Sequence, residues 1–340
     1  MKHILVTGGA GYIGSHTVIE LAHAGYKPVI IDNFTNSNRS VLDRLEQITN
    51  QKISCYEGNY QDHTLLNKVF DQQEIKGIIH FAAYKAVGES VKQPLKYYGN
   101  NVAGLIALLE FLQTVKTNMQ FVFSSSCSVY GNPKILPVTE AAPVQPAVSP
   151  YGETKQMCEQ IIHDTVTVSD NMRALSLRYF NPIGAHDSAL IGELTLGVPS
   201  NLVPYLTQTV AGIRKELIIY GDDYPTRDGT CIRDYIHVVD LAKAHVSALS
   251  HLIKKPTGYY DIFNIGTGSG TTVLEVIQAF QTSTGKKVSY KVGPRRPGDA
   301  VEVYASALKA KQELGWWATK SLEEMLVDAW RWQQVLNEKI

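Results

Sequence analysis

The sequence predicts an α/β fold, with a doubly wound parallel sheet in its first half and a smaller α/β lobe in its second. Short apolar runs alternate with amphipathic stretches over residues 1–181, as strands and helices do in parallel sheets. A glycine-rich turn follows the first apolar run, and polar clusters follow later ones. Open parallel sheets bind ligands at the carboxyl ends of their strands, where these polar residues would lie.

Each apolar run of the first half has the length of a strand. We expect strands at residues 4–6, 29–32, 54–57, 77–82, 120–125 and 174–179. The amphipathic stretches between them predict helices at residues 12–24, 39–48, 63–72, 94–115 and 151–167. Residues 137–150 contain four prolines and are expected to form a loop that leads into the last helix.

After about residue 181 the pattern loosens, and segments rich in Gly, Pro and Asp appear. Short strands are expected at residues 217–220, 261–265 and 287–290, with helices at residues 201–212, 239–249, 273–283, 306–313 and 322–335. The sequence therefore predicts a first domain of residues 1–181 and a second lobe of residues 182–340. Some exchange of chain between the two is expected.

The charge balance limits the classes of partner. Lys and Arg together number 32, as do Asp and Glu, so the formal net charge is zero. Without a basic excess, nothing favours a nucleic acid or an anionic membrane as partner. No stretch approaches the ~20 apolar residues of a membrane span, and the first residues do not resemble a signal peptide. We expect a cytoplasmic protein.

The four cysteines are Cys55, Cys127, Cys158 and Cys231. They are scattered, without a C-x-x-C pair or a nearby histidine at metal-ligand spacing. We expect reduced thiols, as in cytosolic proteins, and no metal site.

The glycine turn has the spacing G-x-x-G-x-x-G, with Gly8, Gly11 and Gly14 between a strand and a helix. Glycines permit a tight turn, and the N–H groups of the following helix can then bind a pyrophosphate. Asp32 ends the second expected strand, where a carboxylate can bind ribose hydroxyls and repel a 2′-phosphate. The pattern predicts a Rossmann-like dinucleotide site that favours NAD over NADP.

A tyrosine and a lysine at i and i+4, Tyr151 and Lys155, stand one residue inside an expected helix start at Ser149 and Pro150. An exposed helix pair would be the ordinary interpretation, but the serines at 124–126 precede it at the end of a strand. A nearby ammonium, the charge of NAD⁺ and the helix N-terminus should lower the pKa of the phenol, which could then move a proton. Ser126 would bind the same reacting oxygen.

Several longer stretches resemble the extended short-chain dehydrogenase/reductase family, and within it the enzymes that invert C4 of UDP-hexoses. The similarity spans nearly all 340 residues. The glycine turn marks only the superfamily, whereas His80-Phe-Ala-Ala-Tyr-Lys-Ala-Val-Gly-Glu-Ser90 and Arg233-Asp-Tyr-Ile-His237 are far more specific. Further matching stretches are residues 6–16, 32–37 and 177–182.

The resemblance assigns binding residues to both ligands. It implies that NAD contacts Gly8, Gly11, Tyr12, Ile13, Gly14, Asp32, Asn33, Asn36, Ser37, Asn59, Tyr60, Phe81, Ala82, Ala83, Lys85, Asn100, Ser124, Tyr151, Lys155 and Phe180. It implies that the UDP-sugar contacts Ser126, Asn181, Asn201, Leu202, Tyr220, Arg233, Arg296, Asp299 and Val303. Arginines suit a diphosphate because their fork binds two oxygens at once.

The implied reaction is reversible epimerisation between UDP-galactose and UDP-glucose through a 4-keto sugar, with Tyr151 as base and acid and tightly bound NAD. Ser126 and Lys155 assist. Two positions depart from the family pattern. Asn59 stands where the family commonly has Asp, and Val303 aligns with a gate that is aromatic in enzymes restricted to glucose and galactose. Valine leaves N-acetylhexosamine substrates open.

Two alternatives remain. A sugar 4,6-dehydratase or UDP-glucuronate decarboxylase is disfavoured because Cys127 and Ser128 follow Ser126, where those relatives carry acidic residues. A non-catalytic NAD-sensing regulator could dispense with Tyr151 and Lys155, yet both are present. The resemblance also implies a homodimer that pairs through the helices at residues 94–115 and 151–167.

Overall fold

The computed structural model describes residues 2–195, 197–296 and 300–338. Its central sheet has seven parallel strands in the order β11-β6-β5-β4-β1-β2-β3. The strands are β1 (His3–Thr7), β2 (Lys27–Asp32), β3 (Ser54–Glu57), β4 (Ile75–His80), β5 (Met119–Ser126), β6 (Met172–Tyr179) and β11 (Tyr260–Ile265). The order reverses between β1 and β4, which marks the ligand-binding edge of such sheets. The predicted doubly wound sheet is confirmed.

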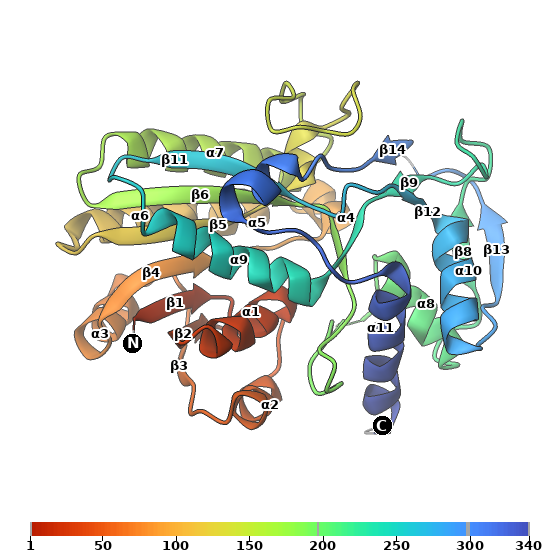
Figure 1. The fold of residues 1–340 in the computed structure, drawn as a ribbon, viewed down its shortest axis with the longest axis horizontal. Helices are drawn as coiled ribbons and strands as arrows, with labels where there is room; N and C mark the ends of the chain where they lie inside the picture. The colour runs from red at the N-terminus through yellow and green to blue at the C-terminus, as the bar shows by residue number, and fades with distance from the viewer. Residues whose placement is uncertain (1, 196, 297–299, 339–340) are drawn as a thin grey trace.

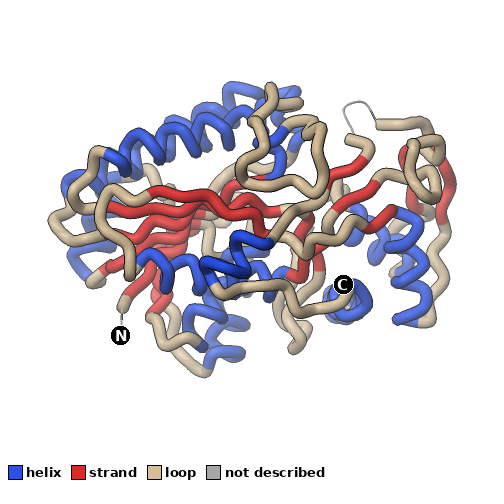
Figure 2. Tube along the Cα trace, turned by 45° about the horizontal axis from the view of Figure 1, so that its top comes forward, coloured by secondary structure: helices blue, strands red, loops and turns tan. Residues whose placement is uncertain are grey.

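Helices cover both faces of this sheet (Figures 1 and 2). One face packs against α1 (Tyr12–His23), α2 (Ser40–Thr49) and α9 (Val238–Leu252), and the other against α3 (His63–Gln72), α6 (Gly104–Thr114) and α7 (Pro150–Thr167). Within β1, Ile4 and Val6 join the first core and Leu5 joins the second. Because successive side chains point to opposite faces, a strand buried on both sides needs a continuous apolar run.

A smaller lobe lies beyond one end of the sheet (Figure 1). Its core is built from α8 (Leu202–Val210), α10 (Val273–Thr284), α11 (Leu322–Asn337) and β8 (Leu217–Tyr220), which pairs with β13 (Tyr290–Gly293). Two small sheets complete it: β7 (Asn181–Ile183) with β10 (Tyr235–His237), and β9 (Ile232–Arg233) between β12 (Thr271–Thr272) and β14 (Glu302–Val303). No disulfide links the four cysteines.

Four sequence predictions about elements need correction. The single helix expected at residues 94–115 is α5 (Pro94–Tyr97), a π-helix η1 (Tyr98–Ala103) and α6. The strand expected at residues 287–290 lies later, as β13, and the helix expected at residues 306–313 is largely the π-helix η3 (Ala310–Leu314). Finally, α9 and β11 were expected in the smaller lobe but belong to the large sheet and its covering layer.

Shorter elements escaped prediction altogether. They include α4 (Val87–Lys92), the 3₁₀-helix η2 (Cys127–Tyr130) and the two- and three-residue strands of the small sheets. Among the described residues, no helix is both long and apolar enough to cross a bilayer.

Candidate active site

Helix α7 brings Tyr151 and Lys155 to the carboxyl end of β5. Ser149 caps the helix by accepting a hydrogen bond from the backbone N–H of Gly152 at 3.2 Å, so the helix begins where predicted. Lys155 Nζ donates to the backbone carbonyl of Ser124 at 2.5 Å. The same ammonium lies 5.9 Å from the ring centroid of Tyr151. The predicted pair and the serine cluster therefore meet.

Burial changes the acidity of both groups. It raises the pKa of Tyr151 to about 12, opposed by a hydrogen bond with Ser126. Burial lowers the pKa of Lys155 to about 8, opposed by the charges of Cys158 and Glu159. In the polypeptide without NAD the pKa of this phenol is therefore not lowered as expected, because burial raises it and the neighbouring Cys127 and Cys158 raise it further. Tyr151 is protonated at neutral pH unless further positive charge stabilises its phenolate.

The glycine turn lies directly against the loop after β4. Gly8 has φ +71°, and a Cβ there would lie 2.9 Å from the backbone nitrogen of Ala82. A Cβ on Gly14 would lie 2.3 Å from the carbonyl oxygen of Gly8. Helix α1 starts at the N-cap Gly11, and no side chain caps it. The turn thus leaves the helix N–H groups for an anion, as a dinucleotide pyrophosphate requires.

Asp32 is buried at the end of β2 and holds the loop that follows it. Its Oδ2 accepts from the Ala10 N–H at 3.0 Å, while its Oδ1 accepts from the Phe34 N–H and the Ser37 hydroxyl, both at 2.9 Å. These bonds fix the carboxylate next to the glycine turn. Its place and charge fit the ribose of NAD and disfavour a 2′-phosphate.

Two hydrogen bonds join pairs of residues that were predicted to contact the cofactor. Asn33 Nδ2 donates to Asn59 Oδ1 at 2.7 Å, so the amide at position 59 already has a partner in its own loop. The Tyr60 hydroxyl donates to the backbone carbonyl of Asn100 in η1. Asn36 is exposed on the loop after β2.

The loop after β4 carries Phe81, Ala82, Ala83 and Lys85, and it reaches across to the smaller lobe. The Phe81 N–H donates to the carbonyl of Thr7 at 3.0 Å, which ties the loop to β1. Lys85 Nζ lies 3.2 Å from Glu193 Oε1. The predicted cofactor side thus contacts the segment that leads to α8.

Predicted substrate residues follow on the other side of this junction. Asn201 is the N-cap of α8, just before Leu202, and its Nδ2 donates to the same Glu193 Oε1 at 3.3 Å. The Asn181 N–H donates to the carbonyl of Asp234 at 2.9 Å. Phe180, predicted for the cofactor, is buried in a small core beside η2.

Tyr220 and Arg296 meet at the far side of the lobe, with the guanidinium carbon 4.6 Å from the ring centroid. The predicted Asp299 lies outside the described residues. Val303 of β14 pairs in register with Arg233 of β9. Val303 is buried and packs with Phe180 and with residues of η2, the 3₁₀-helix that follows Ser126 directly in the sequence.

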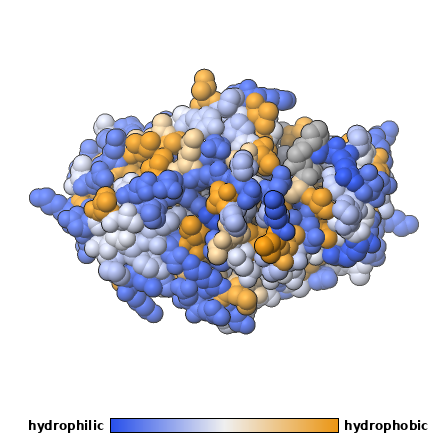
Figure 3. Space-filling view, turned by 90° about the horizontal axis from the view of Figure 1, so that it is seen from above, coloured by the Kyte–Doolittle hydropathy of each residue, from blue (hydrophilic) through white to orange (hydrophobic). Residues whose placement is uncertain are grey.

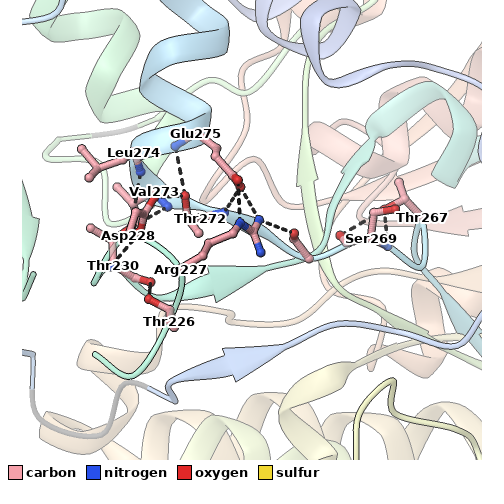
Figure 4. A network of polar contacts seen from close by, with 11 residues as sticks. Thr226, Arg227, Asp228, Thr230, Thr267, Ser269, Thr272, Val273, Leu274 and Glu275 are labelled. Atoms are coloured by element: carbon pink, nitrogen blue, oxygen red, sulfur yellow. Dashed lines mark hydrogen bonds and ion pairs between the residues drawn. The ribbon is translucent and has the colours of Figure 1, made fainter. Parts of the chain in front are cut away.

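The strand that carries Arg233 is held by a polar network at the start of α10 (Figure 4). Arg227 makes a two-point ion pair with Glu275. Thr272 and Glu275 form a capping box, and the Thr272 hydroxyl also donates to Asp228. Because β12 pairs with β9, this network fixes the backbone beside Arg233.

Sequence reasoning missed several polar residues that support the site. Asn101 of η1 bonds to both backbone groups of Tyr84 and, at 3.2 Å, to Thr154 of α7. Glu159 and Arg178 form a buried ion pair behind the serines. The one signal in the sequence was the spacing of four residues between Lys155 and Glu159, which places Glu159 one helical turn after Lys155. The other contacts join segments that are far apart in the sequence.

The chain is similar to known proteins along almost its whole length. The family model described as GDP-mannose 4,6 dehydratase matches residues 5–329. The UDP-glucose 4-epimerase of Bacillus subtilis (strain 168) is 50% identical over 330 residues, covering 97% of this chain and 96% of the relative.

The chain belongs to the UDP-glucose 4-epimerase family.

Solved structures of this family agree along the whole chain. The UDP-glucose-4-epimerase from Stenotrophomonas maltophila, with bound NAD and formylated UDP-arabinopyranose, has a TM-score of 0.97 and 45% identity, covering 100% of both chains. The enzyme from Bifidobacterium longum, in complex with NAD⁺ and UDP, has a TM-score of 0.94 and 44% identity, again covering 100% of both chains. The dehydratase description therefore denotes the wider family.

Proposed function

We propose that the protein is an NAD-dependent enzyme that interconverts UDP-galactose and UDP-glucose by inverting C4. The observation that carries the proposal is the meeting of Tyr151, Lys155 and Ser126 at the end of β5, beside a glycine turn that fits a dinucleotide. Membership of the UDP-glucose 4-epimerase family supports the same reaction.

The cofactor is held by the first domain. The N–H groups at the start of α1 bind the pyrophosphate, and Asp32 binds the adenosine ribose. Asn33, Asn59 and Tyr60 border the adenosine side, while Lys155 and the loop after β4 border the nicotinamide side. When bound, NAD supplies a positive charge and the acceptor, later the donor, of the hydride at C4.

Tyr151 takes the proton of the C4 hydroxyl and later returns it from the opposite face of the sugar. Ser126 hydrogen-bonds the same oxygen and keeps it in place. The ammonium of Lys155, with a pKa lowered by burial to about 8, still carries its proton at pH 7. It therefore favours the phenolate that the buried site otherwise opposes. Because the hydride returns to C4 and the proton returns to the C4 oxygen, no outside reductant is consumed.

The smaller lobe binds the UDP group. Arg233 and Arg296 bind diphosphate oxygens through their planar forks. The other proposed contacts are Asn181, Asn201, Leu202, Tyr220 and Asp299. With the UDP held there, the 4-keto sugar can turn between the two transfers while staying attached. We assign residues 1–181 to the cofactor and residues 182–340 to the sugar nucleotide, except that α9 and β11 extend the first domain.

N-acetylated UDP-hexosamines are proposed as further substrates. Val303 lies buried beside the segment that follows Ser126, whereas an added Cβ on Gly270 would meet the ring of Tyr304 at 3.1 Å. Val303 and the adjacent Tyr304 therefore have different surroundings. Val303 is the residue that lies beside the segment after Ser126. By the family resemblance, the small side chain of Val303 would admit an N-acetyl group that an aromatic ring at this position excludes.

We further propose a cytoplasmic homodimer that pairs through residues 94–115, which form α5, η1 and α6, and through α7. Several apolar side chains on these helices are exposed, namely Leu95, Ile106 and Met157. Figure 3 shows small apolar patches of this kind within a mostly hydrophilic surface. A two-helix contact from each subunit would cover them.

The test is to incubate the purified protein, without added cofactor, with UDP-galactose and separately with UDP-N-acetylgalactosamine. Proton NMR of the anomeric region should show UDP-glucose forming from the first and UDP-N-acetylglucosamine from the second. If neither sugar is inverted, even with supplemental NAD, the proposed function is wrong.

A further inference from the structure

A buried ion pair lies directly behind the serines of the active site. Both side chains are almost fully shielded, with exposed fractions of 3% for Arg178 and 8% for Glu159. Arg178 Nε donates to Glu159 Oε1 at 2.9 Å, and Arg178 Nη2 donates to Glu159 Oε2 at 2.6 Å. The Ser125 hydroxyl donates to the same Oε1 at 2.5 Å. The carboxylate thus accepts three bonds from two strands.

Each residue of this network lies next to a residue that takes part in the proposed reaction, or pairs with such a neighbour. Glu159 follows Lys155 by one turn of α7. Ser125 stands between Ser124, whose carbonyl accepts from Lys155, and Ser126, which bonds to Tyr151. Arg178 is the register partner of Ser125 on the neighbouring strand β6. The Glu159 carboxylate therefore links α7, which carries Tyr151 and Lys155, to β5, which carries the serines.

The network also reaches the segment after Ser126. The guanidinium carbon of Arg178 lies 4.6 Å from the ring centroid of Tyr130 in η2. The Tyr130 hydroxyl in turn donates to Asn264 Oδ1 of β11 at 2.6 Å. Four elements around the site, α7, β5, β6 and η2, are thus fixed to one ion pair.

Stability alone is a weak reason for such a pair. Removing two charges from water costs several kcal/mol per ion, and apolar replacements of similar shape are often as stable or more so. The two-point fork, however, fixes both distance and direction between its partners. A device of this kind suits a site in which a displacement of about 1 Å can cost ~100-fold in rate.

We propose that Glu159, Arg178 and Ser125 are positioning residues for the epimerase reaction, which lock α7 against β5 so that Tyr151 and Lys155 meet Ser126 and Ser124. This inference rests on the proposed function. It assigns no contact with substrate or cofactor to the three residues. They act through the placement of the residues beside them.

The test compares Ser125→Ala with Ser176→Ala. Ser176 is a matched control because it is also a fully buried serine, and it lies on β6 two residues before Arg178. Its hydroxyl forms a 2.9 Å hydrogen bond with the hydroxyl of Tyr260. We expect Ser125→Ala to lower kcat for UDP-galactose by about 10- to 100-fold, with NAD content and melting temperature close to those of Ser176→Ala. The control should keep kcat within about twofold of the parent.

A kcat within twofold of the parent in Ser125→Ala would overturn the inference, as would a fall explained by lost NAD. An inactive parent protein would instead refute the proposed function, and the inference with it.

The pH profile gives a second readout. Lys155 is faced by Tyr151, Cys158 and Glu159 from α7 and by His80 from β4. Glu159→Gln keeps an oxygen acceptor but removes the negative charge, so the inflection of kcat that follows Lys155 should move to lower pH. Ser176→Ala should leave it in place. An unmoved inflection in Glu159→Gln would show that the pair only supports the fold.

Discussion

Tyr151 carries the proposed proton transfer, and its hydroxyl is the smallest group whose removal tests it. Tyr151→Phe keeps the ring and its packing but removes the only atom that can accept or donate the proton. We expect kcat for UDP-galactose to fall by about 10²- to 10⁴-fold, the usual contribution of a general acid–base. The content of bound NAD should stay unchanged. Turnover within a few-fold of the parent would exclude Tyr151 from the reaction.

Lys155 should make the stability of NAD-free protein depend on pH. Burial lowers its pKa from 10.5 to about 8, so between these values the unfolded chain binds a proton that the folded chain has lost. Unfolding free energy attributable to Lys155 therefore rises as pH increases from about 8 to 10.5, by roughly 3 kcal/mol. Urea titrations of the parent and Lys155→Met should diverge in the parent's favour across this window. Parallel curves would contradict the lowered pKa.

At the scale of elements, local pattern predicted most of the large sheet. The first six strands and the helix at Tyr151 follow the apolar runs and the Ser149-Pro150 start, since their signals lie within a few residues. The π-helix η1 and the return of β11 to the sheet could not be predicted, because both depend on distant partners. Asn101 and Arg178 escaped for the same reason: Asn101 acts through contacts with Thr154 and Tyr84, and Arg178 through its ion pair with Glu159, all far apart in the sequence or on other elements.

The π-helix η1 is expected to owe its shape to Asn101. The Asn101 side chain accepts from the Tyr84 N–H at 2.9 Å and donates to the Tyr84 carbonyl at 3.0 Å, besides its bond to Thr154. Asn101→Ala removes this partner from the partly buried backbone groups of Tyr84 and from the buried Thr154 hydroxyl, so we expect a loss of about 2–3 kcal/mol of unfolding free energy. The loop after β4 should also loosen its hold on NAD, which is measurable as cofactor lost on gel filtration. Full retention of both would contradict this role.

Strand β14 should set the size of the accepted sugar. Val303→Tyr places an aromatic ring in a packed position beside Phe180. We expect conversion of UDP-N-acetylgalactosamine to fall by about tenfold or more, because the ring would take space that the N-acetyl group needs, at a cost of about 1.4 kcal/mol or more. Conversion of UDP-galactose should change much less. Tyr304→Phe is the control on the neighbouring position, and an equal loss for both sugars in Val303→Tyr would contradict a gating role.

At the scale of the whole molecule, the proposed homodimer should depend on the helices α5, η1, α6 and α7. Leu95 of α5 has an exposed fraction of 83%, and Leu95→Asp would place a charge in the proposed contact. Sedimentation should then give one chain of 37.6 kDa instead of two. Leu308→Asp is the control, since Leu308 is also exposed, at 65%, but lies outside these helices. Equal masses for the parent and Leu95→Asp would contradict this interface.

The central claim is that the two lobes hold one sugar so that its C4 hydroxyl loses only a proton to Tyr151, while the hydrogen on C4 never reaches the solvent. The most direct measurement is proton NMR of UDP-galactose turned over in D₂O. The product UDP-glucose should keep protium at C4 and at C5. Deuterium at either carbon would mean that a C–H proton is exchanged with water, and the assigned chemistry would be wrong.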